Sequence, residues 1–367
     1  MKVAFDAKRV FHNFTGLGNY ARSTLTMLQT YHPEIEQLLF TPSMGKHHEL
    51  TQPFAGNSVL PQGLLSGNIW RTLGMGADAS CKADIFHGLS NELPLRLDIP
   101  AVVTIHDVAF KTFTDMYKPI DRWIYDKKWA YACKKADHVI AISQSTKQDI
   151  MRFYGVPEEK VTVVYQPVAP SFYEDNDVLH STNPSGEIGD GYMLYVGSIN
   201  SRKNLLAVVQ ALEMIPEGQR LPLVIVGDGR EYKKKVMEYI SARHLEKWCL
   251  FKGHVTTVEE LQILYRNARM FVYPSHYEGM GLPVIEAQLA GCPVITSDVS
   301  SLPEAGGDAA ILIPPKDIRA LSNAMDRLTT DDELWARISK QGRKRCMEKF
   351  HPKTLVGELT RVYGSVR

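Results

Sequence analysis

The sequence has 367 residues, of which 44% are hydrophobic and 23% are charged, and its formal net charge is +1. This composition is ordinary for a soluble globular protein. A net charge so close to zero gives no indication of a bulk nucleic-acid binder. The length predicts two domains.

The cysteines are odd in number and the sequence contains no CxxC pair. We therefore expect reduced, mostly structural thiols of a cytosolic protein and no structural zinc site. The N-terminal apolar run is too short for a signal peptide, and no apolar stretch approaches the length that spans a bilayer. The expected location is the cytoplasm, with room for peripheral contact at the inner face of the membrane.

The first half of the chain alternates short apolar runs, rich in β-branched residues, with helical patterns. Runs that are apolar throughout are typical of parallel strands buried on both faces. The predicted strands are 2–6, 37–41, 84–87, 101–105, 138–142 and 161–165, and the predicted helices are 18–30, 120–135 and 145–153.

Residues 173–190 are polar, turn-rich and aperiodic, which predicts an interdomain linker. The alternation then restarts. The predicted strands are 192–196, 223–226, 249–252, 271–273, 294–296 and 311–313, and the predicted helices are 204–213, 232–243, 258–267, 284–290, 318–328, 333–349 and 353–363.

This alternation predicts an α/β protein made of two doubly wound, Rossmann-like domains, at 1–172 and 191–349. In such sheets, ligands bind beyond the carboxyl ends of the strands. We therefore expect the two domains to face each other across a cleft that holds the functional site.

The segment SHYEGMGLPVIE, which ends at Glu286, follows a predicted buried strand. It places Glu278 in a glycine-rich loop and Pro283 in the first turn of a helix, where its missing N–H costs little. Glu286 is expected in the same turn, so both carboxylates can face one ligand. The N–H groups of Gly281 and Leu282 offer an anion site at the helix start. A purely structural role would not explain the glycines and the proline between the two carboxylates.

The segment GSINSRKN places Arg202 and Lys203 at the start of the predicted helix 204–213. Cations at that position oppose the helix dipole, which favours acidic residues. A phosphate bound between the two side chains would resolve the conflict, because Arg can make a two-pronged contact and Lys acts as a compact charge. The alternative is a solvated basic pair.

These motifs resemble those of glycosyltransferase family 4, a family of retaining enzymes with the GT-B fold. The resemblance covers nearly the full length and includes the E-x7-E and GSxNxRKN elements already described. Its other segments are TGLG at 15–18, TIHD at 104–107, AIS at 141–143 and SDVSSLPE at 297–304. The TIHD and AIS segments are similar to those of mannosyltransferase-like members.

The resemblance implies roles for the matching residues. Arg202 and Lys203 would neutralise the departing diphosphate, Glu278 would hold the donor sugar near its 3-hydroxyl, and His106 would lie beside the 6-hydroxyl. Glu286 would accept hydrogen bonds from the ribose.

Gly16 and Gly18 would let a loop of the first domain close over the diphosphate. Gly253 and Val255 would flank the base, and the backbone N–H groups around Gly281 and Leu282 would meet a phosphate. The resemblance also implies that 1–172 is the acceptor-side domain and that 191–349 binds the nucleotide sugar. The final helix, 350–367, would pack back on the N-terminal domain.

The implied reaction is retaining transfer of a hexose, with mannose as the candidate, from a nucleoside-diphosphate sugar. The acceptor would be a hydroxyl of a glycan or a lipid-linked saccharide, in surface polysaccharide or lipopolysaccharide assembly. Because Arg202 and Lys203 would stabilise the leaving group electrostatically, we expect a metal-independent enzyme with no metal site and no cofactor. Asp175-Asn176-Asp177 superficially matches a DxD metal motif, but no strand precedes it, which indicates solvated chain.

Other functions remain as alternatives. A nucleotide-sugar epimerase or hydrolase of GT-B fold is not excluded by the fold, although E-x7-E together with RKN disfavours it. A glycosidase would also use two carboxylates, but not the basic pair. Gly16 opens a G-x-G-x-x-A pattern typical of dinucleotide oxidoreductases, but eight residues separate it from Ala7, whereas the true fingerprint opens directly from its strand. Intact motifs disfavour a non-enzymatic binding subunit.

The segment 111–135 carries seven Lys or Arg against three Asp, with two Trp and two Tyr interleaved after residue 122. Basic and aromatic residues together can indicate contact with a membrane surface or a lipid-linked acceptor. We expect instead a helix that buries its aromatic side chains in the core. The sequence indicates no nucleic-acid partner.

Overall fold

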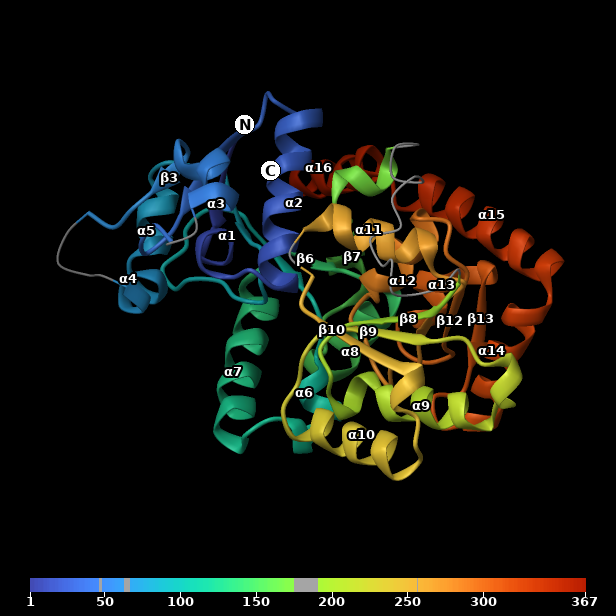
Figure 1. Ribbon diagram of the computed structural model, residues 1–367. Coiled ribbons are helices and arrows are strands. Elements are labelled where there is room, and N and C mark those ends of the chain that lie inside the picture. The colour runs from blue at the N-terminus through green and yellow to red at the C-terminus, as the bar shows by residue number, and fades with distance from the viewer. Residues whose placement is uncertain (46–47, 63–66, 175–190, 256) are drawn as a thin grey trace. The chain divides into compact units, whose positions relative to one another are not determined.

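The computed structural model describes residues 1–45, 48–62, 67–174, 191–255 and 257–367 (Figure 1). The chain forms two compact units: unit 1 contains Met1–Pro167 and Pro352–Arg367, and unit 2 contains Val168–His351. From residue 175 on, the predicted linker lies outside the described residues, and so does Asp175-Asn176-Asp177.

Unit 1 is built on a parallel sheet whose described strands have the order β3-β2-β1-β4-β5-β6-β7. The order reverses between β1 and β4, which pair directly. In open α/β sheets such a reversal opens a crevice at the carboxyl ends of the strands, where ligands bind. The strands are β1 (Lys2–Asp6), β2 (Glu36–Phe40), β3 (Ser58–Val59), β4 (Ile85–Gly88), β5 (Ala101–Ile105), β6 (His138–Ala141) and β7 (Val161–Val163).

The helices of unit 1 include the last helix of the sequence. Helix α16 (Pro352–Val366) lies beside α2 (Gly16–Tyr31), as Figure 1 shows for its red and blue ribbons. Its side chains enter the apolar core that α2 and the sheet share. The other helices are α1 (Lys8–His12), α3 (His48–Ala55), α4 (Gly67–Leu73), α5 (Met75–Ser80), α6 (Ala109–Thr112), α7 (Pro119–Lys135) and α8 (Gln144–Tyr154).

Unit 2 repeats the design with a second parallel sheet, of order β10-β9-β8-β11-β12-β13 in the described residues. Here the order reverses between β8 and β11, which pair directly. The strands are β8 (Met193–Val196), β9 (Leu223–Val226), β10 (Cys249–Gly253), β11 (Met270–Tyr273), β12 (Val294–Ser297) and β13 (Ala310–Ile313). The helices are α9 (Leu205–Met214), α10 (Glu231–Ala242), α11 (Val258–Asn267), α12 (Leu282–Leu289), α13 (Leu302–Gly306), α14 (Ile318–Thr330) and α15 (Asp332–Lys349).

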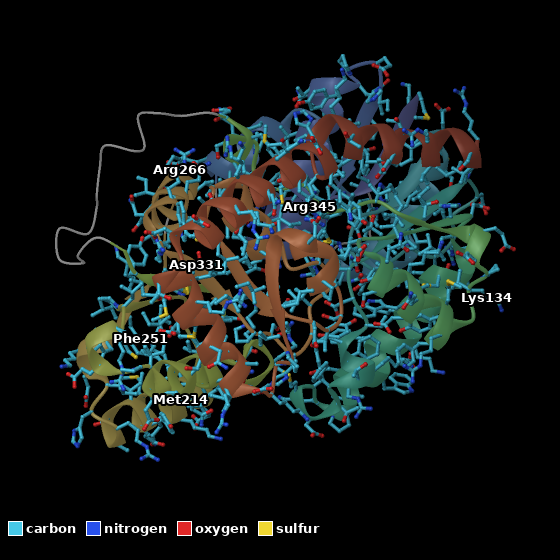
Figure 2. The ribbon with its side chains drawn as sticks, turned by 90° about the vertical axis from the view of Figure 1, so that its right-hand side faces the viewer. Lys134, Met214, Phe251, Arg266, Asp331 and Arg345 are labelled. Atoms are coloured by element: carbon cyan, nitrogen blue, oxygen red, sulfur yellow. The ribbon has the colours of Figure 1, made fainter. Side chains whose placement is uncertain are left out.

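Local sequence chemistry sets several helix ends. The Asp331 side chain accepts a hydrogen bond from the Leu334 N–H and caps α15, which satisfies one of the unpaired donors of its first turn. Near the other end of α15, Arg345 donates to the carbonyl oxygens of Glu304 and Ala305 at the end of α13 (Figure 2). Side-chain contacts therefore tie α15 to the short helix that follows β12.

The predicted fold class, two doubly wound parallel sheets, is confirmed. The strands other than β3 were predicted to within about two residues at each end, whereas β3, α1, α3–α6 and α13 were not predicted. None of the helices among the described residues is long and apolar enough to cross a membrane.

Two local predictions were wrong. Helix α12 begins at Leu282, so Glu286 is its fifth residue and lies beyond the first turn. The aromatic residues of α7 are not all buried in the core: Trp123 is 60% exposed, whereas Trp129 and Tyr131 are partly buried and pack against the core of unit 1.

Candidate functional site

The reversal point of the unit 2 sheet brings two loops together. One loop follows β8 and carries Arg202 and Lys203, and the other follows β11 and carries Glu278. Because β8 and β11 are neighbours in the sheet, the two loops leave it side by side. Arg202 and Tyr277, which are 75 residues apart in the sequence, are therefore in direct contact.

Glu278 pairs with both cations. The Arg202 Nη1 atom lies 3.0 Å from Glu278 Oε2, and the Lys203 Nζ atom lies 3.4 Å from Glu278 Oε1. Burial by itself would raise the pKa of Glu278, but Lys203 and Arg202 outweigh this effect and hold the pKa below its ordinary value. Glu278 is therefore ionised at neutral pH. Its charge balances one of the two cations and leaves a net positive charge for an anionic ligand.

Two hydroxyl groups complete this cluster. Tyr273 donates to Glu278 Oε1 at 2.8 Å and also contacts the Lys203 ammonium. Ser275 lies 2.9 Å from the same carboxylate oxygen. Burial lowers the pKa of Lys203, although Glu278 opposes that shift. The Glu278 carboxylate thus has a fixed position before any ligand arrives.

The loop after β8 differs from the predicted helix start. Arg202 and Lys203 lie in a short 3₁₀ turn (Ser201–Lys203), and Asn204 separates this turn from α9 with a left-handed φ of 59°. The Asn204 amide donates to the carbonyl oxygens of Pro274 and Pro315 at 3.2 and 2.7 Å. The Glu278 carboxylate therefore balances part of the positive charge of Arg202 and Lys203, for which the sequence alone had suggested a bound phosphate.

Glycine turns line the same edge of the sheet next to the basic pair. Gly227, which follows β9, has no room for a side chain, because a Cβ atom there would lie 2.0 Å from the Gly197 carbonyl oxygen. The Gly227 N–H donates to the carbonyl oxygen of Gly253 at 2.7 Å, and Gly253 has a φ of 73°. Val255 is half-buried two residues further on. The turns after β8, β9 and β10 therefore form one continuous backbone surface.

The start of α12 is also fixed by close packing. Gly281 has a φ of 79°, and a Cβ atom there would lie 2.8 Å from the Leu302 side chain. Leu282 follows as the first residue of α12. The Glu278 N–H donates to Ser300 Oγ, and Ser301 Oγ donates to the Glu278 carbonyl oxygen. The SDVSSLPE segment therefore holds the backbone of the glutamate loop.

Glu286 occupies a different environment. Its carboxyl group receives a hydrogen bond from the Tyr265 hydroxyl at 3.2 Å. Burial raises the pKa of Glu286 to about 7, against the smaller lowering effects of Tyr265 and Lys203. The two glutamates of the E-x7-E element are thus chemically distinct, because one is ionised and the other titrates near neutrality.

In unit 1, His106 follows β5 and is buried. Its Nε2 lies 2.9 Å from the carbonyl oxygen of Leu89, which can only accept, so Nε2 carries the proton. Its Nδ1 lies 2.7 Å from the Gln166 amide nitrogen and accepts from it. Burial lowers the pKa of His106 to about 4, so the ring is neutral at pH 7. Both ring nitrogens are engaged within unit 1.

Gly16 and Gly18 belong to the first turn of α2, which begins two residues before the predicted helix start at residue 18. A Cβ atom at Gly18 would lie 1.7 Å from the Asn13 carbonyl oxygen, so this position requires glycine. The space around Gly16 is open.

Arg202, Lys203 and Glu278 make direct contacts, Gly281 ends the glutamate loop and Leu282 begins α12. Gly253 is hydrogen-bonded to Gly227, which packs against Gly197 in the loop after β8. His106, Gly16 and Gly18 lie in unit 1. Sequence reasoning gave no role to four side chains that hold the two glutamates: Tyr265, Tyr273, Ser275 and Ser300. The available signals were the position of Tyr273 at the carboxyl end of a strand and the presence of Ser275 and Ser300 within two of the segments already singled out.

Comparison with known proteins agrees with this arrangement. The family described as "Glycosyl transferases group 1" matches residues 184–345, and "Glycosyltransferase Family 4" matches residues 35–172. The O-antigen chain mannosyltransferase B of Escherichia coli is 30% identical over 364 residues, spanning 92% of this chain and 93% of that protein.

The chain belongs to glycosyltransferase family 4. A second relative of this family 4 chain, the O-antigen chain mannosyltransferase RfbU of Salmonella typhimurium, is 26% identical over 226 residues, which covers 62% of this chain and 60% of that protein. The crystal structure of Anabaena Alr3699/HepE in complex with UDP and glucose has a TM-score of 0.78, with 16% identity and full coverage of both chains. The fold is therefore the GT-B fold of family 4 glycosyltransferases.

Proposed function

We propose that this glycosyltransferase moves a mannosyl group from a nucleoside-diphosphate sugar to a glycan hydroxyl, with retention of anomeric configuration. The convergence of Arg202, Lys203 and Glu278 at the reversal point of the unit 2 sheet carries the proposal. The mannosyl specificity and a role in surface polysaccharide assembly rest on the names of the two O-antigen mannosyltransferases.

The proposed division of labour follows from the charges. Unit 2 binds the donor, with the Arg202 fork and the Lys203 ammonium at the diphosphate, where negative charge builds as the sugar leaves. Glu278, fixed by Tyr273 and Ser275, accepts hydrogen bonds from the donor sugar. Glu286 and the N–H groups of Gly281 and Leu282 are assigned to the ribose and a phosphate, and Gly253 and Val255 to the base.

In unit 1, Gly16 and Gly18 are assigned to the diphosphate, and His106 to the donor sugar. Because both nitrogens of His106 are already hydrogen-bonded, a sugar hydroxyl reaches a ring nitrogen only by replacing Leu89 or Gln166. The departing diphosphate takes the acceptor proton, so no separate enzyme base is assigned. The two fixed cations take the role that a divalent metal has in other transferases.

The test is a transfer assay with a panel of GDP-, UDP- and ADP-sugars and mannose-terminated oligosaccharides, run in the presence of EDTA. Arg202→Ala and Lys203→Ala should each lower the turnover number about 10²–10³-fold, because an oriented charge at a developing anion is lost. Lys234→Ala removes an exposed cation paired with Glu238 on α10 and is the matched control, expected at wild-type rate.

Proton NMR of the fresh product reports the anomer. Inversion, or activity that is lost in EDTA and restored by magnesium or manganese, would contradict the retaining, metal-independent mechanism. A nucleotide sugar that is only epimerised or hydrolysed would support the alternative enzymes of the same fold.

We also propose peripheral membrane contact through the outer side of α7. Ile120 and Trp123 are 59% and 60% exposed, and Lys127 and Lys134 are also exposed. The four positions are separated by three, four and seven residues, which places them on the same side of a helix. An apolar strip beside lysines fits the interface of an anionic bilayer.

Sedimentation with vesicles that contain phosphatidylglycerol should bring down the protein. Trp123→Ser together with Ile120→Ser should reduce this binding. Met214→Ser, which removes an exposed apolar side chain on α9 of unit 2, should not. Equal binding by the α7 variant and wild type would contradict the proposal.

A further inference from the structure

A chain of buried hydrogen bonds runs through unit 1 from α16 to α2. The Tyr363 hydroxyl lies 2.7 Å from Nδ1 of His87, and Nε2 of His87 lies 2.8 Å from Oγ1 of Thr104. The Tyr20 hydroxyl lies 3.0 Å from the same Thr104 oxygen. These four residues, which we call the hydroxyl network, come from four separate elements: α16, β4, β5 and α2.

The hydroxyl network is buried and uncharged. Its members are at most 3% exposed. Burial lowers the pKa of His87 to about 3, with a smaller contribution from His106. His87 is therefore neutral at pH 7, and a neutral imidazole has one N–H and one acceptor nitrogen. It can accept from one of its two hydroxyl neighbours and donate to the other, so both of its ring nitrogens are satisfied.

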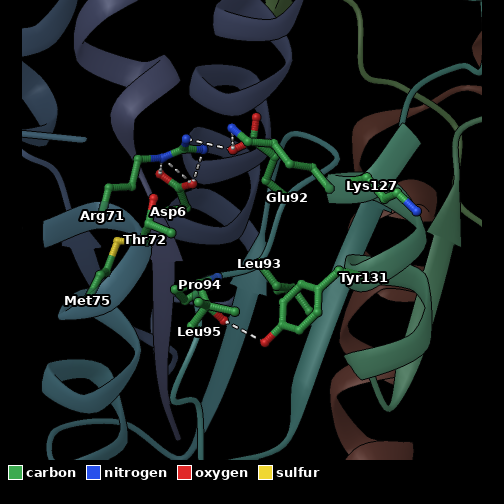
Figure 3. Close-up of a pocket in the computed structure, with 11 residues that line it drawn as sticks. Asp6, Arg71, Thr72, Met75, Glu92, Leu93, Pro94, Leu95, Lys127 and Tyr131 are labelled. Carbon is green, nitrogen blue, oxygen red and sulfur yellow. Dashed lines mark hydrogen bonds and ion pairs between the residues drawn. The ribbon is translucent and has the colours of Figure 1, made fainter. Parts of the chain in front are cut away.

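Unit 1 also contains a charged network, and the two networks share no residue. In the charged network, the carboxylates of Asp6 and Glu92 balance the Arg71 guanidinium (Figure 3). Removal of one partner from such a network leaves an uncompensated buried charge. Removal of one hydroxyl from the uncharged network does not, so its variants report on geometry and not on buried charge.

The hydroxyl network ends at His106. The Tyr20 and His106 rings are in edge-to-face contact, with their centroids 4.6 Å apart and their planes at 88°. Thr104 lies two residues before His106, near the end of β5. Tyr20 is also the fifth residue of α2, whose first turn contains Gly16 and Gly18. Tyr20 therefore contacts one group that the proposed function gives to the donor and belongs to the same helix as two others.

The tyrosine hydroxyls need a reason, because an apolar ring would fit the same surroundings at lower cost. Tyr20 and Tyr363 belong to the apolar core that α2, α16 and the sheet share. A buried hydroxyl costs free energy unless it is hydrogen-bonded. A hydrogen bond is directional, whereas an apolar contact is not. The Thr104 oxygen therefore fixes the orientation of the Tyr20 ring, against which His106 packs.

We propose that Tyr363, His87 and Thr104 are positioning residues, which hold the Tyr20 ring and, through it, keep His106 in the place that the donor sugar requires. This inference rests on the proposed function, because that function assigns His106 to the donor sugar. It gives α16 a part in the transfer reaction, since Tyr363 reaches His106 through three hydrogen bonds and one ring contact.

Single hydroxyl deletions in the full chain test the network. Thr104→Val keeps the shape of the side chain and removes both hydrogen bonds at the centre, whereas Tyr363→Phe removes one at the far end. Thr104→Ser keeps the central hydroxyl. Tyr131→Phe is the matched control, because the Tyr131 hydroxyl donates to the Pro94 carbonyl oxygen outside the network (Figure 3). Melting temperatures establish that each variant is folded under the conditions of the assay.

The kinetic readout separates positioning from nucleotide binding. The turnover number should fall on the order of tenfold in Thr104→Val and less in Tyr363→Phe, because a small displacement of a group beside the reacting sugar slows transfer. Binding of the free nucleoside diphosphate should not change, since the proposed function assigns most of its contacts to unit 2. Thr104→Ser and Tyr131→Phe should transfer at the wild-type rate.

A double-mutant cycle with His106→Ala shows whether the effect passes through His106. Residues that act through one another have non-additive effects. Thr104→Val and Tyr363→Phe should therefore lower the turnover number of wild type but not the residual turnover number of His106→Ala. Nitrogen-15 NMR of the histidine rings, with the His106 signal identified by its loss in His106→Ala, should show a shifted His106 signal in Thr104→Val and an unshifted one in Tyr131→Phe.

The outcomes distinguish this inference from the proposed function. Equal losses in the wild-type and His106→Ala backgrounds, wild-type turnover in both Thr104→Val and Tyr363→Phe, or an unshifted His106 signal in Thr104→Val would overturn the positioning role. Wild-type turnover in His106→Ala would instead overturn the assignment of His106 to the donor sugar, and a wild-type protein that transfers no sugar would overturn the proposed function. In both of these cases the NMR signal still decides whether the network holds His106.

Discussion

His106 is held on both sides of its ring, and this determines how it responds to pH. The Leu89 carbonyl oxygen fixes the proton on Nε2, and the Gln166 amide donates to Nδ1. A protonated ring would place an N–H opposite the Gln166 N–H group, so Gln166 reinforces the neutral state that burial already favours. Arg9 adds to this effect, because its positive charge also lowers the pKa of His106.

Gln166→Glu should therefore raise the pKa of His106 above its present value of about 4, because a carboxylate can accept from Nδ1–H. The unfolded His titrates near pH 6.5, so wild type loses stability as the pH falls from about 6.5 toward 4, where only the unfolded state binds the proton. In Gln166→Glu this loss should be smaller.

Nitrogen-15 NMR of the histidine ring and melting temperature against pH measure the two effects. Gln166→Leu is the control, and its pKa should stay low because burial remains. A Gln166→Glu protein that titrates like wild type at both readouts would show that Gln166 does not set the state of His106.

Single residues also show the limit of reading this site from sequence. Arg202, Lys203 and Glu278 were identified as site candidates from their motifs, but their mutual pairing was not, because it depends on β8 and β11 being neighbours. The difference in pKa between Glu278 and Glu286 could not be predicted from the sequence either. It arises from Tyr265 and from burial at α12, and neither leaves a signature near Glu286 in the sequence.

On the scale of elements, the loop after β8 is held to the loop after β11 by Asn204. Its left-handed conformation turns the chain into α9, and its amide donates to Pro274 and Pro315. The helical pattern of 204–213 predicted the helix to within a residue but could not show this break, because the apolar periodicity begins only after Asn204.

Asn204→Gly keeps access to a positive φ but removes both hydrogen bonds. It should destabilise unit 2 by about 1–3 kcal/mol at about 0.5–1.5 kcal/mol per bond. It should also lower the transfer rate, because Arg202 and Lys203 lose their support. Melting temperature and turnover, measured side by side, test this.

His244→Gly is the matched control, since His244 has a φ of 53° outside this loop and its replacement should leave transfer unchanged. Asn204→Asp should be worse than Asn204→Gly, because a carboxylate would face two carbonyl oxygens. Wild-type turnover in Asn204→Gly would show that only the backbone conformation matters.

The strands were predictable for a physical reason. Strands such as Ala101–Ile105 and Leu223–Val226 are buried along their whole length, so their apolar runs coincide with their bounds. The missed elements lack such a pattern. Helix α4 presents Ile69 and Leu73 to solvent while it buries Arg71, which reverses the usual relation between polarity and burial. The buried ion pairs of Arg71 with Asp6 and Glu92 could not be predicted from the sequence for the same reason.

At the scale of the whole molecule, the chain leaves unit 1 at Pro167 and returns to it at Pro352. Helix α16 then buries Leu355, Val356 and Leu359 in the core of unit 1. Further along, the Tyr363 hydroxyl bonds to His87 at 2.7 Å. Unit 1 is therefore discontinuous in sequence, whereas unit 2 is one continuous segment.

A chain that stops after His351 should lose the fold of unit 1 and keep that of unit 2. Four aliphatic side chains of α16 are buried, and at about 1.5–3 kcal/mol each they contribute on the order of 6–12 kcal/mol. That amount is comparable with the ~5–15 kcal/mol net stability of a typical domain. Limited proteolysis and calorimetry should show a protease-sensitive unit 1 and an intact transition for unit 2.

Adding a peptide of residues 352–367 should partly restore protection. Tyr363→Phe, which removes only the hydroxyl bonded to His87, is the control and should keep both transitions. If the truncated chain resists proteolysis as wild type does, α16 is not required for the core of unit 1.

The return of the chain at Pro352 also sets an order of events on the ribosome. Residues 168–351 are synthesised before α16, and at about 5–20 residues per second they take on the order of ten seconds or more. During that interval the nascent N-terminal sheet has an open apolar groove where α16 will lie. The second unit translated can therefore finish folding first, whereas the first one waits until α16 has been synthesised.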